Sequence, residues 1–383
     1  MKIDKLFLFV LCLFFIIHKD ALCINKSKDI NTSTHTIDTL MQNIELDLCL
    51  NYGFLIQHHY ETSAFNAHFP MFELSLQKQT YGGSEWHSYY NYPTIGLTAF
   101  YTDFGSVDIY GKAFALYPFI NFPFNKSKEN TIGLRFGVGL GYLTKKFDTY
   151  RNFNNTTIGS NFNAAINLSL EYKRLVSERF KMAFFISLTH FSNGCSHQPN
   201  AGINAASAGI SGAYLFNEES HYIHPASNIK TSYKKIKPEF YIGMSYGMKR
   251  IYYMQNDNFS VYNLELYAMD RVSKLSKFGI GFDIVYDLTD KLETEELYQK
   301  YTELTFYEKL KPGISIAYEL LISDVSFIFN FGYHLYGIEM SYGRWYQKIG
   351  IKINFGSHLY GKITLNTHFG VADYVGFGLG IKL

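Results

Sequence analysis

The sequence predicts an all-β protein, a transmembrane antiparallel β-barrel of about 14 to 16 strands. Apolar and polar residues alternate with a period of two from Ile44 to the final residue, Leu383. The 383 residues include 32 Tyr, 34 Phe and 30 Gly, a composition that suits the aromatic girdles of a membrane barrel. After the N-terminal region, no apolar run approaches the roughly 18 residues that a membrane-spanning helix needs.

The first residues have the anatomy of an export signal. Lysines near Met1 precede the apolar run Leu6–Ile17, which is too short to span a membrane as a helix. Ala21-Leu22-Cys23 offers a cleavage site, so we expect a signal peptide over residues 1–23. Lipid modification of Cys23 is an alternative that the neighbouring residues fit poorly.

After the signal peptide, the sequence predicts two further parts. Residues 24–43 are polar and form a short lead-in, and residues 44–383 form an outer-membrane β-barrel. Closure of the sheet is expected because an open edge in hydrocarbon leaves backbone groups without hydrogen-bond partners. A soluble β-sandwich shares the period of two, but the export signal and the aromatic content favour the membrane barrel.

Two strands illustrate the alternation. The strand Ile132–Tyr142 carries apolar residues at every second position, with Arg135 and several glycines between them. The glycines at positions 137, 139 and 141 are therefore expected to face the lumen instead of forming a nucleotide-binding loop. The final segment, Val375–Leu383, repeats the pattern and ends on an apolar residue, as the closing strand of such a barrel does.

Charge and cysteine content exclude some functions and leave others open. The formal net charge is +2, from 35 basic and 33 acidic residues, which gives no reason to expect nucleic-acid binding. Cys49 and Cys195 remain in the mature chain and either pair or stay free.

A last strand that descends to the periplasm fixes the expected direction of the others. The strand 179–193 then ascends, and its Asn193-Gly194 end lies outside the cell. The charged stretch Asp287–Lys311 also lies outside, as a solvated loop or with a short helix within Glu293–Glu308.

The strand from Arg179 carries polar groups where lipid-facing residues are expected. Phe184, Ile186 and Leu188 define the outer face, and the same parity continues to His190 and Ser192. On the next strand Asn204 shares the parity of Ile210, Tyr214 and Phe216 and also points outward. His368, in a second Thr-His-Phe tripeptide, shares parity with Lys362 and is expected to face the lumen in a structural role.

A His and a Ser at this spacing can perform acyl transfer. Residues i and i+2 of a strand lie about 6.6 Å apart at the backbone, so the imidazole of His190 can reach the hydroxyl of Ser192. The His would take the Ser proton as general base. Asn193 and the backbone amides of Gly194 and Cys195 would bind the oxyanion. Merely solvated polar residues in the headgroup region are the alternative.

The segment His190-Phe191-Ser192-Asn193-Gly194, followed by Pro199-Asn200-Ala201-Gly202-Ile203-Asn204, resembles the motif of the outer-membrane lipid A 3-O-deacylases, also called acyloxyacyl hydrolases. More loosely, residues 44–383 resemble the long, many-stranded form found in Bacteroidetes-like bacteria. The resemblance implies an esterase that removes an acyl chain from lipid A in the outer leaflet of a Gram-negative outer membrane. It implies no cofactor and no metal.

The resemblance also implies roles for three residues. His190 would be the base and Ser192 the nucleophile, while Asn204 would take the place of the family's Glu, which orients the His. This is a departure, because replacing the acid of a serine-protease triad by its amide costs about 10⁴ in rate. Exterior cations would meet the lipid phosphates (Lys145, Lys146, Arg151 and Arg344). The alternatives are a non-catalytic barrel, either a porin or a degenerate relative, and a phospholipid esterase.

Overall fold

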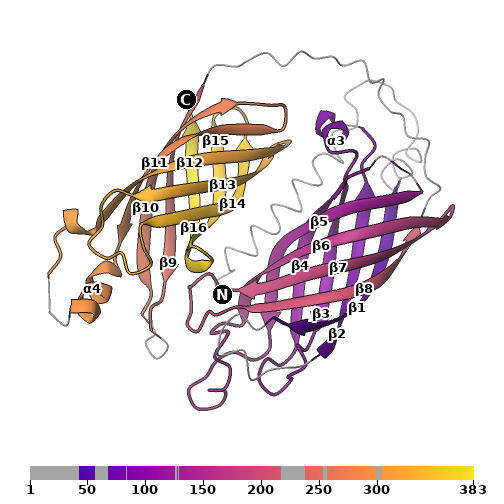
Figure 1. Cartoon of the computed structure of the whole chain (residues 1–383), viewed down its shortest axis with the longest axis horizontal. Coiled ribbons are helices and arrows are strands. Elements are labelled where there is room, and N and C mark those ends of the chain that lie inside the picture. Colours follow the sequence, from indigo (N-terminus) through magenta and orange to yellow (C-terminus); the bar gives the residue numbers. More distant parts are fainter. Residues whose placement is uncertain are drawn as a thin grey trace, which may run out of the picture. The chain divides into compact units, whose positions relative to one another are not determined.

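The computed structural model describes residues 43–56, 68–82, 84–125, 127, 129–216, 238–252, 257–298 and 303–383. The expected signal peptide and all of the expected lead-in except Asn43 lie outside these ranges. The described strands are antiparallel and form two closed barrels of eight strands each (Figure 1).

In the first barrel each strand pairs with the next, and β1 closes the sheet by pairing with β8. Its strands are β1 (Ile44–Leu55), β2 (His68–Gln79), β3 (Thr94–Thr102), β4 (Ala113–Pro123), β5 (Asn130–Leu143), β6 (Phe162–Ser177), β7 (Phe180–Ser192) and β8 (Ile203–Leu215).

The second barrel is closed by the pairing of β9 with β16. Its strands are β9 (Glu239–Lys249), β10 (Phe259–Arg271), β11 (Ser276–Asp287), β12 (Leu310–Ile322), β13 (Val325–His334), β14 (Trp345–Phe355), β15 (Leu359–His368) and β16 (Val371–Lys382). By its contacts the short segment Gly194–Gln198, between β7 and β8, groups with this second unit.

The all-β antiparallel barrel fold and the strand count are confirmed, but the prediction of one barrel over residues 44–383 needs correction. The sixteen described strands form two separate closed barrels of eight strands each. The alternation of residues fixes which face of a strand is apolar, and it carries no information about which distant strand closes a sheet. Pairing of β1 with β8 therefore could not be deduced from the period of two.

Alternation of burial along each strand explains why these sequences form barrels. In β1 the residues Leu46, Leu48 and Leu50 are exposed on the outside, whereas Glu45, Asp47 and Cys49 are buried inside. An apolar exterior and a polar interior are the arrangement of a transmembrane barrel. The described residues contain no helix that is long and apolar enough to cross a membrane.

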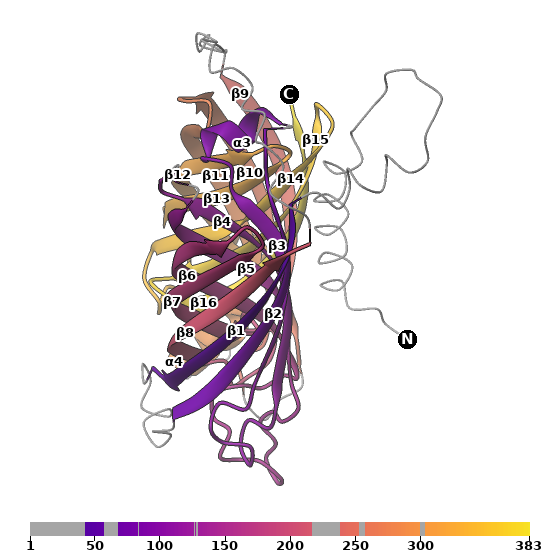
Figure 2. The same cartoon turned by 90° about the vertical axis from the view of Figure 1, so that its right-hand side faces the viewer.

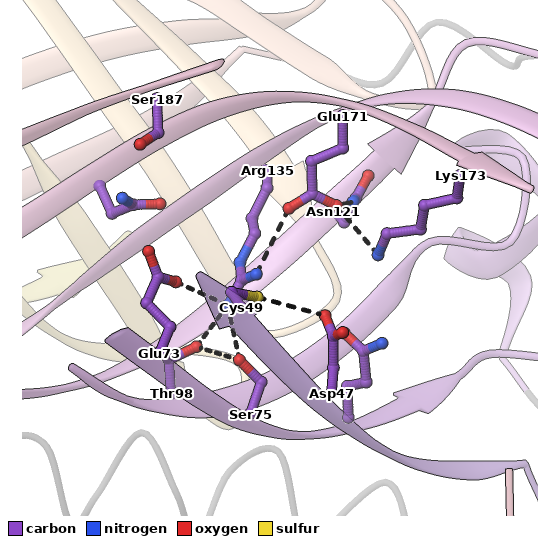
Figure 3. A network of polar contacts seen from close by, with 12 residues as sticks. Asp47, Cys49, Glu73, Ser75, Thr98, Asn121, Arg135, Glu171, Lys173 and Ser187 are labelled. Atoms are coloured by element: carbon purple, nitrogen blue, oxygen red, sulfur yellow. Dashed lines mark hydrogen bonds and ion pairs between the residues drawn. The ribbon is translucent and has the colours of Figure 1, made fainter. Parts of the chain in front are cut away.

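The interior of the first barrel is filled by a network of buried charges, seen from close by in Figure 3. Arg135 lies 3.3 Å from a carboxylate oxygen of Glu171 and 3.7 Å from one of Glu73. Lys173 pairs with Glu171 at 2.9 Å, and the hydroxyl of Tyr117 donates to Glu73 at 3.0 Å. Eight strands enclose a space just wide enough for side chains, so this network plugs the barrel.

Lumen-facing glycines make room for this packing, as the sequence predicts. A Cβ on Gly137 would lie 2.6 Å from the ring of Tyr117, and one on Gly141 would lie 2.4 Å from the ring of Phe191. The second barrel is filled in the same manner. Lys348 pairs with Glu265 at 3.0 Å and with Asp283 at 2.5 Å.

The two ends of each barrel differ in the length of their connections. In the first barrel the connections 103–112 and 144–161 lie at the end where β7 finishes, and the turn 178–179 and the connection 80–93, which holds helix α3 (Glu85–Tyr89), lie at the other (Figure 2). Outer-membrane barrels have short periplasmic turns and long extracellular loops. The connection 144–161, which is longer than any of the other connections described for this barrel, favours the Asn193 end of β7 as the outer end, and the direction of the strand stays a prediction.

In the second barrel the long connections follow β9, β11 and β13. The connection after β11 contains helix α4 (Asp290–Tyr298) and a 3₁₀ turn, η2 (Tyr307–Lys309). Asp290 and Thr294 on α4 are buried. The expectation of a solvated loop over Asp287–Lys311 is thus corrected, because its first half folds into a helix with a buried face.

Candidate active site

Strand β7 presents His190 and Ser192 on the outer face of the first barrel. Phe184 and Ile186, on the same face, are 58% and 59% exposed, whereas Thr189 is buried in the lumen. His190 and Ser192 are half-buried. The parity of β7 therefore places an imidazole and a hydroxyl toward the membrane at the outer end of the strand.

Phe191, between these two residues, points inward and is fully buried. Its ring lies 5.4 Å from that of Phe104 and 5.9 Å from that of Phe100, measured between centroids. Aromatic pairs at this separation are stabilising. The inner residue thus anchors the segment that carries the two outer polar groups.

Pairing of β7 with β8 brings His190 opposite Asn204. The Nδ1 atom of His190 lies 2.6 Å from the Oδ1 atom of Asn204. Because an amide oxygen only accepts hydrogen bonds, this contact places the imidazole proton on Nδ1 and leaves the lone pair on Nε2. Two residues that are 14 positions apart in the sequence are therefore neighbours in the structure.

Ser192 and Asn193 share one acceptor in the following loop. The Ser192 hydroxyl donates to Oδ1 of Asn200 at 3.0 Å, and the backbone N–H of Asn193 donates to the same oxygen at 2.9 Å. Asn200 belongs to the segment that carries the sequence resemblance, but sequence reasoning assigned it no role. Its contact depends on how the loop turns back toward β7, which no periodicity indicates.

Gly202 packs directly against the imidazole. It has a φ of 78°, and a Cβ at this position would lie 2.9 Å from Cε1 of His190. A side chain here would be strained and would press on the ring. Gly202 is therefore required both by the backbone conformation and by the space that His190 occupies.

The loop between β5 and β6 supports the segment that follows Ser192. The N–H of Gly159 donates to the carbonyl of Pro199 at 2.7 Å, and the N–H of Gly202 donates to that of Thr157 at 3.2 Å. Ile158 also forms a β-bridge with Asn200. Three backbone contacts thus fix the loop that holds Asn200 and Gly202.

The outer part of the same loop carries exposed cations and aromatic rings. Lys146, Tyr150, Arg151 and Phe153 are exposed. Backbone N–H groups of Tyr150 and Arg151 donate to Asp148, and these hydrogen bonds lower the pKa of its carboxyl. The tip of the loop therefore has a defined turn. Lys145 is exposed and donates to the carbonyl of Asp108 at 2.9 Å.

The remaining predicted residues are placed as follows. Asn193 is buried directly after β7, and Gly194 and Cys195 both have positive φ, of 59° and 65°. Gly194 and Cys195 belong to the second unit, whereas Ser192 and Asn193 belong to the first. The role of these residues in binding an oxyanion therefore stays a prediction. Cys49 and Cys195 are not joined by a disulfide. Arg344, in the second barrel, donates to the carbonyls of His334 and Leu335.

Residues 71–211 match the family model described as lipid A 3-O-deacylase (PagL), and residues 238–383 match the one described as acyloxyacyl hydrolase, C-terminal domain. The first match contains His190, Ser192 and Asn204. Each match falls on one of the two barrels, and together they cover most of the chain. A search of curated proteins gave no match.

Two solved structures with similarity to the chain are an outer membrane enzyme and a bacterial surface protein. The outer membrane enzyme PagL is 17% identical, with a TM-score of 0.31, over 43% of this chain and 97% of PagL. Neisserial surface protein A is 6% identical, with a TM-score of 0.30, over 46% of this chain and 98% of its own.

The two family matches and the two closed barrels with apolar exteriors agree. The chain belongs to the lipid A 3-O-deacylase (acyloxyacyl hydrolase) family, whose members are hydrolases of ester bonds in the Gram-negative outer membrane.

Proposed function

We propose that the first barrel hydrolyses an ester-linked acyl chain of lipid A, with Ser192 as nucleophile, His190 as base and Asn204 as the residue that orients the base. The observation that carries this proposal is the 2.6 Å contact between His190 Nδ1 and Asn204 Oδ1 on the outer face of the barrel. It supports the tautomer that a general base needs, with Nε2 free to accept a proton.

In the proposed reaction, the Ser192 oxygen attacks the acyl carbonyl carbon while its proton passes to Nε2 of His190. The protonated His then delivers this proton to the sugar oxygen as the ester bond breaks. Water, deprotonated by the same His, releases the fatty acid from Ser192 in a second step. Before attack the Ser192 hydroxyl must leave its hydrogen bond to Asn200.

Developing negative charge on the carbonyl oxygen requires hydrogen-bond donors. Asn193, Gly194 and Cys195 remain the proposed donors, the last two through their backbone amides. The Asn193 N–H donates to Asn200 in the described structure, so Asn193 would contribute its side chain or exchange this partner. The two positive-φ residues that follow favour a turn in which successive N–H groups converge.

Several features support lipid A as the substrate. The site opens on the outer face near the outer end of β7, where an ester in the outer leaflet would lie. The exposed Lys146 and Arg151 suit phosphate groups, and Tyr150 and Phe153 suit the interface between headgroups and acyl chains. A porin is less well supported, because charged side chains fill the interior of the first barrel.

The test is the mass of lipid A after incubation with the purified full chain in detergent. We expect the loss of one acyl group, and Ser192→Ala should reduce the rate to the uncatalysed background. Ser88→Ala, at an exposed position on α3, is the matched control and should leave the rate unchanged. A Ser192→Ala variant that retains activity overturns the assignment, and release of fatty acid from phospholipid alone favours a phospholipid esterase.

A further inference from the structure

Three carboxylates converge at the outer end of the second barrel. Asp290 and Glu293 come from α4, which follows β11 (Figure 1), and Glu339 comes from the loop between β13 and β14. One carboxylate oxygen from each residue lies within 4.8 Å of the others. Asp290 is fully buried, and Glu339 is 6% exposed. Like charges held this close repel one another unless a cation or a proton lies between them.

Protein donors satisfy only part of this cluster. Lys311 lies 2.6 Å from Oδ1 of Asp290 and 3.8 Å from Oε2 of Glu339. Thr289 donates to Oε2 of Glu293, and the N–H of Ser341 donates to Oε1 of Glu339. Oδ2 of Asp290 is buried and has no hydrogen-bond partner among the described residues. One lysine therefore faces three carboxylates.

Nearby charges do not remove this excess of negative charge. Lys249 is the next cation, and it already pairs with Asp287 at 2.6 Å and with Asp373 at 2.9 Å. Among the described residues around the cluster, five carboxylates therefore face two lysines (Asp287, Asp290, Glu293, Glu339 and Asp373 with Lys249 and Lys311).

A cavity beside the cluster gives an independent indication of a ligand. Its volume is about 30 Å³, and Glu293 and Glu339 contribute to its lining. Two further lining residues, His334 and Tyr374, are 6% and 2% exposed. The Nδ1 atom of His334 and the hydroxyl of Tyr374 have no partner among the described residues. A polar space of this size with orphaned polar atoms is suited to an ion together with water.

We propose that Asp290, Glu293 and Glu339 bind a divalent cation of the calcium class. Calcium takes six to eight oxygen ligands in a flexible geometry, so three carboxylates supply part of its shell and water in the cavity supplies the rest. Magnesium demands a near-ideal octahedron, which ligands from a helix and a separate loop meet less readily. The ion would fasten α4 and the loop after β13 to the outer end of the second barrel.

The test uses the purified full chain in detergent, stripped with a chelator. Terbium(III) is the first probe, because Tyr342 and Tyr374 line the cavity and would sensitise its luminescence. Calcium should displace terbium and raise the thermal midpoint of unfolding by about 5 °C or more at saturation.

Two variants keep the proposal falsifiable if one of them fails to fold. Glu339→Gln and Glu293→Gln each remove a ligand charge and should raise the calcium dissociation constant at least about tenfold. Glu303→Gln, at an exposed position in the same connection as α4, is the control and should bind like the wild type. Sensitised luminescence that is absent in the wild type overturns the proposal. Calcium binding that survives in both ligand variants also overturns it.

Discussion

Replacement of Asn204 by Asp tests the proposed catalytic geometry most directly. The two side chains have nearly the same shape, so Asp should keep the 2.6 Å contact with His190 Nδ1 and add a full negative charge. A hydrogen bond to a charged partner is worth about 1.5–3 kcal/mol, against about 0.5–1.5 kcal/mol for a neutral one. The extra stabilisation of the imidazolium is then about 1–1.5 kcal/mol, which corresponds to about a tenfold increase in kcat.

The gain should be smaller than the factor of about 10⁴ that separates acid from amide in a serine-protease triad. Part of that factor comes from a wrong tautomer. Here the Asn204 oxygen already accepts from Nδ1, so only the charge is missing.

The assay is the rate of acyl release from lipid A by wild type, Asn204→Asp and Asn204→Ala. Asn258→Asp, at an exposed position in the connection after β9, makes the same charge change outside the proposed site and should leave the rate unaltered. Asn204→Ala should lower kcat. If Asn204→Ala retains the wild-type rate and Asn204→Asp adds nothing, Asn204 does not orient the base.

Three other perturbations have defined outcomes. Gly202→Ala should lower kcat about 10- to 100-fold by displacing His190. The control Gly343→Ala also has a positive φ, but its Cβ would meet no atom within 4 Å, so kcat should not change. Equal rates in both variants would contradict the role of Gly202 in positioning His190. Arg135→Met leaves Glu73 and Glu171 without their shared cation and should lower the free energy of unfolding in denaturant by about 3–5 kcal/mol. The control Lys146→Met, at an exposed position, should have little effect. A wild-type unfolding midpoint for Arg135→Met would refute the importance of the network. Burial, with a smaller contribution from Lys78, lowers the pKa of His87 in α3 from 6.5 to about 4. The stability that the neutral His87 contributes is therefore present above pH 6.5 and is lost as the pH falls toward 4. Hydrogen exchange of the segment 80–93 should accelerate over this pH interval, and constant protection would show that His87 does not control the stability of the segment.

Sequence patterns predicted the faces of the strands better than their partners. The parity of β7 correctly placed Phe184, Ile186 and His190 on the outer face, because successive side chains of a strand point to opposite faces. The division into two barrels could not be predicted, since closure depends on pairing between strands as distant as β1 and β8. Each strand would look the same in one large barrel or in two small ones.

The candidate site shows the same limit at the scale of single residues. Asn204 could be placed on the same face as His190 because both lie on neighbouring strands with a known parity, and the structure adds the register that pairs them. Asn200 could not, since its contact with Ser192 depends on a loop that is held by backbone hydrogen bonds from another connection. Gly202 was visible in the sequence only as part of a motif. Its reason is the 2.9 Å approach that a Cβ would make to His190.

The position of Asn204 also offers a physical reason for an amide where the family motif has an acid. The side chain lies on the outer face of the barrel, where an ionised group costs more the deeper it sits in the membrane. A neutral amide avoids this cost and still holds the tautomer of His190. Asn204→Asp should therefore increase kcat while slightly lowering the free energy of unfolding, by roughly 0–1 kcal/mol near the interface. A gain in both rate and stability would mean that the site is fully hydrated and that the membrane does not explain the amide.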